Sequence, residues 1–172
     1  MRQHTSEANI AGASLTLADY TSPGLVISSL RAQDAAAVIQ ELSVALQREA
    51  RVPDLLPFYH SALNREFLCS TATEPGWALP HALVKGLDTA CFALGRSTAP
   101  MVWMAKDKQR VQFVFLLAVP ETDARAYMTV ISGLARLSKD ARSTEGLLKA
   151  ADTFEMLEVL KQVKVRVNQA PS

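Results

Sequence analysis

The chain has 172 residues, enough to bury a sizeable core without disulfides or a metal, and it is most simply interpreted as one domain. Apolar residues make up 49% and charged residues 20%, a balance that excludes a disordered chain and is typical of a globular protein. The formal net charge of +1 carries no bulk electrostatic sign of a nucleic-acid-binding or membrane-binding protein.

The cysteines and the N-terminus indicate the compartment. Cys69 and Cys91 are far apart and lack metal-ligand spacing, so we expect two free thiols, buried or half-buried, and neither a zinc site nor a disulfide. No apolar stretch approaches the length of a membrane span, and none follows the N-terminal residues as in a leader peptide. These features favour a reducing, cytoplasmic setting.

The first third of the chain predicts two short extended segments and then two helices. Residues 1–14 are small and polar and are expected to form a disordered tail. Residues 15–17 and 24–27 are extended candidates on either side of a turn. Apolar residues at spacings of three and four then predict a helix over 33–50 and a second over 54–66 that begins at Asp54.

The middle of the chain predicts strands. Residues 90–94 and 101–104 are apolar enough for two short strands, and the polar segment 106–110 has the length of a hairpin connection. The run 111–119 is almost uninterruptedly apolar, which is typical of a central strand covered on both faces, and Pro120 ends it.

The last third returns to helical spacing. It predicts a helix over 123–138, a short helix around Leu147 and a final helix that opens at Asp152. We expect one domain over residues 15–164 and a frayed tail over 165–172. The order of elements predicts an α/β three-layer sandwich, with a mixed β-sheet flanked by helices on both faces.

One stretch, residues 65–81, combines chemically useful side chains. It starts with Arg65 in the last turn of a predicted helix, passes Ser70, Thr71 and a Pro-Gly turn, and ends at His81, which follows a proline. A neutral imidazole has a lone pair near pH 7, a guanidinium binds phosphoryl oxygens in a fork, and hydroxyl groups can complete the cradle. The stretch therefore predicts a phosphate-handling site. The alternative is a structural histidine beside an arginine that only compensates the helix dipole.

A family resemblance is carried by Arg65-Glu66, Ser70-Thr71, the segment Gly76-Trp77-Ala78-Leu79-Pro80-His81 and the apolar run 111–120. Together they resemble the signature of the fructose/mannitol-type enzyme IIA domains of the bacterial phosphoenolpyruvate-dependent phosphotransferase system, which include the nitrogen-regulatory IIA proteins. The resemblance covers about the last two-thirds of the chain.

The resemblance implies the same three-layer fold and a role for each residue of the motif. His81 would accept a phosphoryl group from the histidine-containing phosphocarrier protein, for relay to a IIB partner or as a regulatory signal. Arg65 would pair with the phosphoryl oxygens, and Ser70 or Thr71 would donate to them, with Thr71 preferred. No metal or organic cofactor is implied.

Two positions depart from the family pattern. Tyr127 matches the place of a second histidine, and a phenol can donate one hydrogen bond to phosphate but stays neutral near pH 7. The alternative for Tyr127 is a core aromatic with its hydroxyl at the surface. Glu74 replaces a small flexible residue, and its carboxylate would repel a phosphoryl group unless it turns away. Trp77 is expected in the core, with a docking contact as its alternative.

These departures leave a second hypothesis open. The chain could be a regulatory protein-interaction module that keeps the fold, has weak or no phosphotransfer and binds a kinase, transporter or transcription factor. The lack of a fused IIB or membrane segment favours a nitrogen-regulatory protein over a sugar-transport component. His60 is expected to be a surface or packing residue, and Lys85 is a minor candidate for charge beside the phosphoryl group.

Overall fold

The apolar run 111–119 forms the centre of a mixed sheet, as its hydrophobicity predicts. The computed structural model describes residues 14–106 and 108–167. Its strands are β1 (Val26–Ile27), β2 (Trp77–Ala78), β3 (His81–Val84), β4 (Cys91–Val102) and β5 (Arg110–Pro120). The strand order is β1-β4-β5-β2, and β3 follows β2 along the same side of β5. Strands β4 and β5 pair antiparallel, while β1, β2 and β3 lie parallel to their neighbours.

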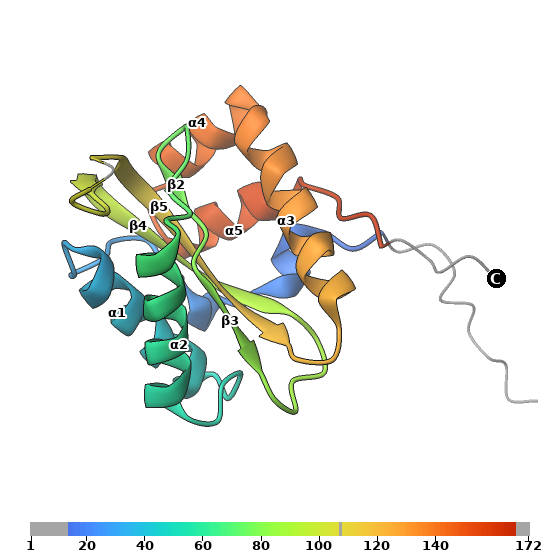
Figure 1. Ribbon diagram of the computed structural model, residues 1–172. Helices are drawn as coiled ribbons and strands as arrows, with labels where there is room; N and C mark the ends of the chain where they lie inside the picture. Colours follow the sequence, from blue (N-terminus) through green and yellow to red (C-terminus); the bar gives the residue numbers. More distant parts are fainter. Residues whose placement is uncertain (1–13, 107, 168–172) are drawn as a thin grey trace, which may run out of the picture.

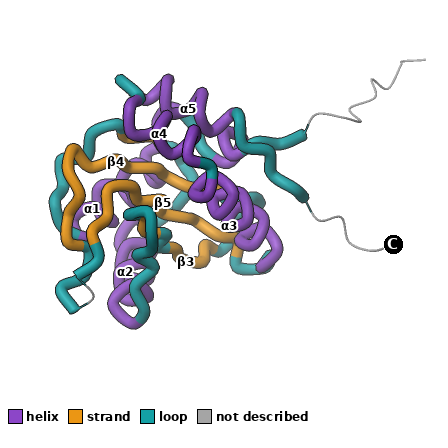
Figure 2. The backbone as a smooth tube through the Cα atoms, turned by 90° about the horizontal axis from the view of Figure 1, so that it is seen from above, coloured by secondary structure: helices purple, strands orange, loops and turns teal. Residues whose placement is uncertain are grey.

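Helices cover both faces of the sheet (Figure 1). They are α1 (Ala35–Arg48), α2 (Leu55–Leu68), α3 (Ala124–Lys139), α4 (Ala141–Lys149) and α5 (Thr153–Lys161), with 3-10 turns η1 (Leu17–Tyr20) and η2 (Pro23–Leu25). In the described part of the chain, α1 and α2 pack on one face, and α3 and α5 pack on the other with α4 beside them (Figure 2). The predicted α/β three-layer sandwich is confirmed.

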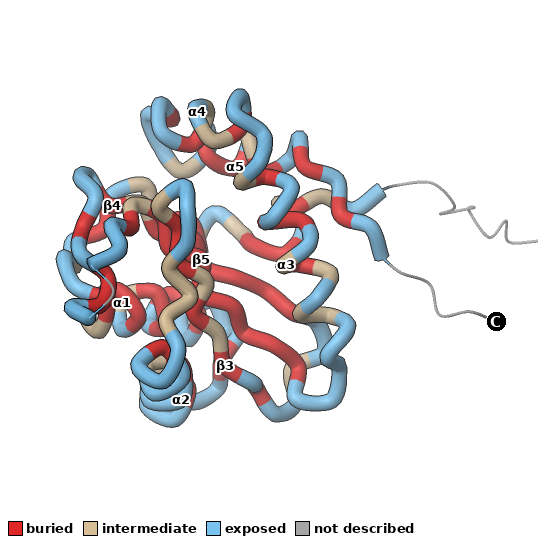
Figure 3. The backbone as a smooth tube through the Cα atoms, turned by 45° about the horizontal axis from the view of Figure 1, so that its top comes forward, coloured by how far each residue is buried: buried red, intermediate tan, exposed pale blue. Residues whose placement is uncertain are grey.

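Strand β5 connects the two halves of the core, because successive side chains of a strand point to opposite faces. Its buried side chains alternate between the cluster under α1 and α2, which takes Val114, Leu116 and Ala118, and the cluster under α3 to α5, which takes Phe113, Phe115, Leu117 and Val119. Buried positions run along the strands, whereas the outer sides of the helices are exposed (Figure 3). Each large apolar side chain buried in this way contributes about 1.5–3 kcal/mol to folding.

The helix starts follow the predicted aspartates. Asp152 accepts a hydrogen bond from the Glu155 N–H at 2.9 Å, and the Glu155 carboxylate accepts one from the Ala151 N–H at 2.8 Å. These reciprocal bonds satisfy backbone donors that a helix N-terminus leaves free. Asp54 precedes α2 as predicted, although its side chain makes no capping hydrogen bond.

The N-terminal strand predictions are partly wrong. Leu17 begins η1 instead of ending a strand, because the Asp19 carboxylate accepts the Thr16 N–H at 2.7 Å and closes a tight turn. The segment 24–27 is extended only in β1, since Pro23 opens η2 just before it. The predicted tail 1–14 lies outside the described residues except for Ser14.

Two further predictions need correction. The predicted strands 90–94 and 101–104 are joined in one strand, β4, which leaves out Ala90, Trp103 and Met104 and whose pairing with β5 changes register between Arg96 and Met101. The tail is not frayed at its start: Val165 is buried, and its N–H donates to the Leu15 carbonyl at 2.7 Å. Residues 168–172 of that predicted tail lie outside the described residues.

Candidate functional site

His81 opens β3, on the sheet edge that β2 and β3 share. Its backbone pairs with Leu117 of β5, whose N–H donates to the Pro80 carbonyl at 2.9 Å. The half-buried imidazole places Nδ1 3.2 Å from the Leu79 carbonyl oxygen. A carbonyl oxygen can only accept, so this contact is a hydrogen bond when Nδ1 carries the ring proton, and in that tautomer the lone pair is on Nε2.

The sheet edge is interrupted just before His81, and the cause is local. β2 ends at Ala78, and Pro80 has no N–H to contribute to a ladder. The Leu79 N–H instead donates to Thr71 Oγ1 at 2.8 Å. A side chain thus replaces the strand partner at the break, and His81 is the first residue after it.

The loop before the break is a tight turn anchored by Trp77. Thr73 and Trp77 exchange backbone hydrogen bonds of 2.8 and 3.0 Å, and Gly76 between them has a φ of +100°, which side chains with a Cβ rarely adopt. The Trp77 ring is buried against Phe113 and Phe115, with centroid separations of 6.1 and 4.8 Å. The core interpretation of Trp77 is confirmed, and its docking alternative is wrong.

The two hydroxyl residues of the motif differ in what they can donate. Thr71 Oγ1 lies 3.0 Å from each carboxylate oxygen of Glu66 and accepts the Leu79 N–H, so its one proton is directed at Glu66. Ser70 Oγ accepts the Ala72 N–H at 3.2 Å, and within residues 14–106 and 108–167 its own proton has no acceptor. The geometry therefore favours Ser70 over Thr71 as a donor to a ligand, the reverse of the sequence-based preference.

Glu66 is the residue that sequence reasoning missed. Its side chain has no solvent exposure, and its Oε1 accepts hydrogen bonds from the Thr71 N–H and from Trp103 Nε1, both at 2.7 Å. A signal was present in the sequence: Glu66 continues the buried stripe of α2, four residues after Ala62, which itself follows Phe58 by four. A carboxylate on an apolar stripe needs buried donors, and here three groups supply them.

Arg65, the neighbour of Glu66, lies on the outside of the last turn of α2. Its side chain is exposed and takes part in no hydrogen bond or ion pair with the residues that the structure describes. The guanidinium is therefore available to an anion. The structure does not bond it to His81 or to either hydroxyl, so its role in the site stays a prediction.

Tyr127 is brought to His81 by the first turns of α3. This helix starts at Asp123, whose carboxylate accepts the N–H groups of Arg125 and Ala126. The half-buried Tyr127 ring lies on the imidazole, with centroids 4.9 Å apart and planes tilted by 41°. Of the candidate residues, Tyr127 touches His81 directly, and Thr71 reaches it through Leu79.

The remaining candidates lie at the surface. Glu74 and Lys85 are exposed, and exposed His60 lies against Tyr59 with a centroid distance of 5.4 Å, as predicted for a surface or packing residue.

The thiols are unlike each other. Cys69 is exposed, which corrects the expectation that it would be buried or half-buried. Cys91 is buried in β4, and this burial raises its pKa to about 11.

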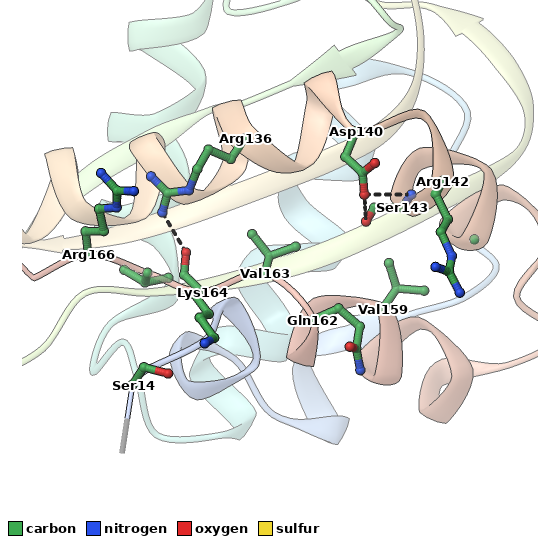
Figure 4. A pocket seen from close by; sticks show the side chains of 12 residues that line it. Ser14, Arg136, Asp140, Arg142, Ser143, Val159, Gln162, Val163, Lys164 and Arg166 are labelled. Atoms are coloured by element: carbon green, nitrogen blue, oxygen red, sulfur yellow. Dashed lines mark hydrogen bonds between the residues drawn. The ribbon is translucent and has the colours of Figure 1, made fainter. Parts of the chain in front are cut away.

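A cavity of about 790 Å³ with a basic lining lies between α3, α4 and the C-terminal segment (Figure 4). The cations that line it are Arg136, Arg142, Lys164 and Arg166. Arg136 donates to the Lys164 carbonyl at 2.6 Å, and the Ser143 hydroxyl donates to Asp140 and lowers its pKa. This cavity shares no lining residue with the candidate site around His81.

Neither a metal site nor a membrane span is found among the residues that the structure describes. They hold no group of three or more histidine, cysteine, aspartate or glutamate side chains placed to bind a metal ion. No helix within these ranges combines the length and apolarity needed to cross a membrane.

Comparison with proteins of known sequence gives distant relatives. The chain is 26% identical over 146 residues to a nitrogen regulatory protein of Bradyrhizobium diazoefficiens, an alignment that covers 85% of this chain and 95% of the relative. It is also 26% identical over 125 residues to the fructose-specific EIIABC component of the phosphotransferase system of Bacillus subtilis. That alignment covers 73% of this chain but only 20% of the much longer relative.

Solved structures share the fold. The nitrogen regulatory protein IIA-Ntr of Neisseria meningitidis has a TM-score of 0.72 at 24% identity, over 84% of this chain and 98% of that one. The IIA mannitol protein of Escherichia coli, in its complex with phosphorylated IIB mannitol, has a TM-score of 0.68 at 17% identity, over 81% and 95%.

The family model described as "Phosphoenolpyruvate-dependent sugar phosphotransferase system, EIIA 2" matches residues 19–163, most of the chain. This range includes α2, the loop before His81, the strands β1 to β5, and α3 with Tyr127. The chain therefore belongs to the EIIA 2 family of the phosphoenolpyruvate-dependent sugar phosphotransferase system.

Proposed function

We propose that the chain is a phosphocarrier whose His81 accepts a phosphoryl group on Nε2 from the histidine-containing phosphocarrier protein. It then relays the group to a IIB partner or keeps it as a regulatory signal. The observation that carries this proposal is the hydrogen bond from Nδ1 to the Leu79 carbonyl, because it leaves the lone pair on Nε2. Membership of the EIIA 2 family supports the reaction class.

The transfer step is a balanced exchange of one N–P bond for another. The Nε2 lone pair attacks the phosphorus of the donor phosphohistidine, the donor N–P bond breaks, and the electron pair returns to the donor ring. With a proton already on Nδ1, the His81 ring becomes positively charged when it is phosphorylated. The Leu79 carbonyl oxygen, 3.2 Å from Nδ1, stabilises that charge.

In the proposed reaction, Ser70 and Arg65 would bind the phosphoryl oxygens. The Ser70 hydroxyl proton and the Arg65 guanidinium are both uncommitted within the described part of the chain. A guanidinium offers a planar pair of donors that match two phosphoryl oxygens. Tyr127 packs against the imidazole, where it restricts the ring and adds a hydroxyl rather than a cation.

The experiment is a phosphorylation assay with phosphoenolpyruvate, enzyme I and the histidine-containing phosphocarrier protein. We expect an acid-labile phosphoryl adduct that is lost in His81→Ala and kept in His60→Ala, a histidine exposed on α2. Absence of an adduct on the wild-type chain, with upstream proteins shown to be active, would contradict the proposal.

The regulatory protein-interaction module remains the second candidate, and the packing of Tyr127 on His81 is the observation that favours it. A phenol in this place provides no positive charge for a phosphoryl group. The same assay decides between the two functions. A Tyr127→His variant that gains transfer when the wild type has none would assign the loss to this residue.

A further inference from the structure

We infer that buried Glu66 is a positioning residue for His81, acting through Thr71 and Leu79 to keep the ring proton on Nδ1. The inference deepens the proposed function, because it explains how Nε2 would stay free to accept the phosphoryl group. It rests on a continuous series of hydrogen bonds that starts in the core and ends at the imidazole.

The series starts in an apolar environment. Glu66 has no solvent exposure, and Trp103, which donates to it from the segment after β4, is only 3% exposed. The same carboxylate accepts the Thr71 N–H at 2.7 Å and lies 3.0 Å from the Thr71 hydroxyl. Glu66, Trp103 and Thr71, which we call the Glu66 cluster, thus join α2, the end of β4 and the loop before His81.

The carboxylate determines which way the Thr71 hydroxyl points. Glu66 Oε1 accepts the Thr71 N–H and the Trp103 indole N–H and lies 3.0 Å from Thr71 Oγ1, so the Thr71 proton faces this acceptor and the free lone pairs of Oγ1 face the other way. There they accept the Leu79 N–H at 2.8 Å. A hydroxyl without Glu66 could rotate and place its proton toward that N–H, so the carboxylate makes this hydrogen bond directional.

Leu79 connects Thr71 to His81. Its N–H is held by Thr71, and its carbonyl oxygen lies 3.2 Å from Nδ1 of His81. Pro80 follows and has no N–H, so β5 holds the segment at this residue only through the Pro80 carbonyl, which accepts the Leu117 N–H at 2.9 Å, and not at Leu79 itself. If Leu79 moves, Nδ1 loses its acceptor. A hydrogen bond of ordinary strength biases the tautomer ratio by about five- to tenfold, so its loss places the proton on Nε2 in a large share of molecules.

This arrangement assigns Thr71 a role different from binding phosphate. Its hydroxyl makes two hydrogen bonds inside the protein and has no second proton to donate. Thr71→Val should therefore act on the resting imidazole, before any phosphoryl group arrives. A role limited to phosphate binding, or a merely structural role, would leave the tautomer unchanged.

The test is ¹⁵N NMR of the histidine rings at about pH 8, where an ordinary imidazole is neutral. We expect His81 in the wild type and in Thr71→Ser to be protonated on Nδ1, and Thr71→Val to show a mixture of tautomers. Thr73→Val is the matched control: it makes the same change in the same loop, at an exposed residue whose hydroxyl bonds to none of the described residues. Folding of each variant is checked by thermal unfolding.

Two results overturn the inference. One is a folded Thr71→Val with the wild-type tautomer ratio, and the other is a wild-type His81 that carries its proton on Nε2. If Thr71→Val does not fold, amide exchange in the wild type decides. The Leu79 N–H should then exchange much more slowly than the exposed Glu74 N–H, and equal rates contradict the hydrogen bond to Thr71.

The outcome is independent of the phosphorylation assay, because the tautomer is measured on the unphosphorylated chain. A tautomer change in Thr71→Val without phosphoryl transfer in the wild type would keep the inference and reject the proposed function. If both hold, Thr71→Val should transfer about two- to threefold more slowly at saturating phosphocarrier protein, with its KM unchanged, because only molecules with a free Nε2 react.

Discussion

The central strand and the edge that carries His81 are built by different means, although they lie side by side in one sheet. β5 is continuous over Arg110–Pro120, and from Phe113 onward its side chains are buried. The edge consists of the short strands β2 and β3, and the Thr71 hydroxyl satisfies a backbone group in the break between them. Apolar burial thus holds the scaffold, whereas a few directed hydrogen bonds hold the candidate site.

The largest expected effect comes from breaking the central strand. Leu116→Ala removes a fully buried side chain and should lower the free energy of unfolding by about 2–5 kcal/mol, because it leaves a cavity between the sheet and α1. Chemical denaturation measures the loss. Leu83→Ala on the edge strand β3 is the control: its side chain is 62% exposed, so the change should stay within about 0.5 kcal/mol. Equal losses in the two variants would refute the contrast.

The next effect concerns the turn before the site. Gly76→Ala should cost about 1–3 kcal/mol, because a Cβ at a φ of +100° would lie 3.3 Å from the Arg110 carbonyl oxygen. Gly86 has a φ of +77° and no atom within 4 Å of an added Cβ, so Gly86→Ala carries only the backbone strain. Thermal unfolding should rank Gly76→Ala as the less stable variant. The opposite order would show that the close approach to the Arg110 carbonyl does not destabilise the fold.

A smaller effect is expected in the Glu66 cluster. Trp103→Phe removes one donor from the buried carboxylate and should lower the free energy of unfolding by about 1 kcal/mol. Tyr59→Phe on α2 is the control, since its hydroxyl bonds to none of the residues in the described ranges. A Trp103→Phe variant as stable as this control would indicate that Glu66 does not need the indole N–H.

The smallest effect on the free energy of unfolding at neutral pH is expected from the two cysteines, whose thiols should instead differ in reactivity. Cys69 should react quickly with a thiol reagent and Cys91 only after unfolding, because Cys91 is buried and its pKa is raised to about 11. The raised pKa means that the folded state favours the protonated thiol. This stabilisation is complete below the ordinary pKa near 9 and is lost as the pH rises toward 11. Cys69→Ser should abolish the fast reaction, and a fast phase that survives would place Cys91 at the surface.

The scaffold was largely predictable because its signals are repetitive. The apolar run of β5 and the helical spacing of α1, α2 and α3 each involve many residues, so a single exception does not hide them. β4 was divided in two because its middle, residues 95–100, contains glycine, polar residues and Pro100, which resemble a turn. Its pairing with β5 overrides these local preferences.

The site was predictable in its chemistry but not in its connections. The position of His81 follows from the motif, whereas the Glu66 carboxylate that binds Thr71 also depends on a tryptophan 37 residues further along the chain. No local pattern links Glu66 to Trp103. The exposure of Arg65 beside the burial of Glu66 follows from the turn of α2, and only the buried stripe of that helix could have indicated it.

The lengths of the strands have a consequence for how a partner can approach. On the side of β5 that carries His81, the sheet ends in the short strands β2 and β3, of two and four residues. Such short borders offer too few free backbone groups for another chain to add a strand. A visiting protein that reaches the imidazole must therefore recognise side chains and surface shape, and it can leave again without peeling away from a backbone ladder.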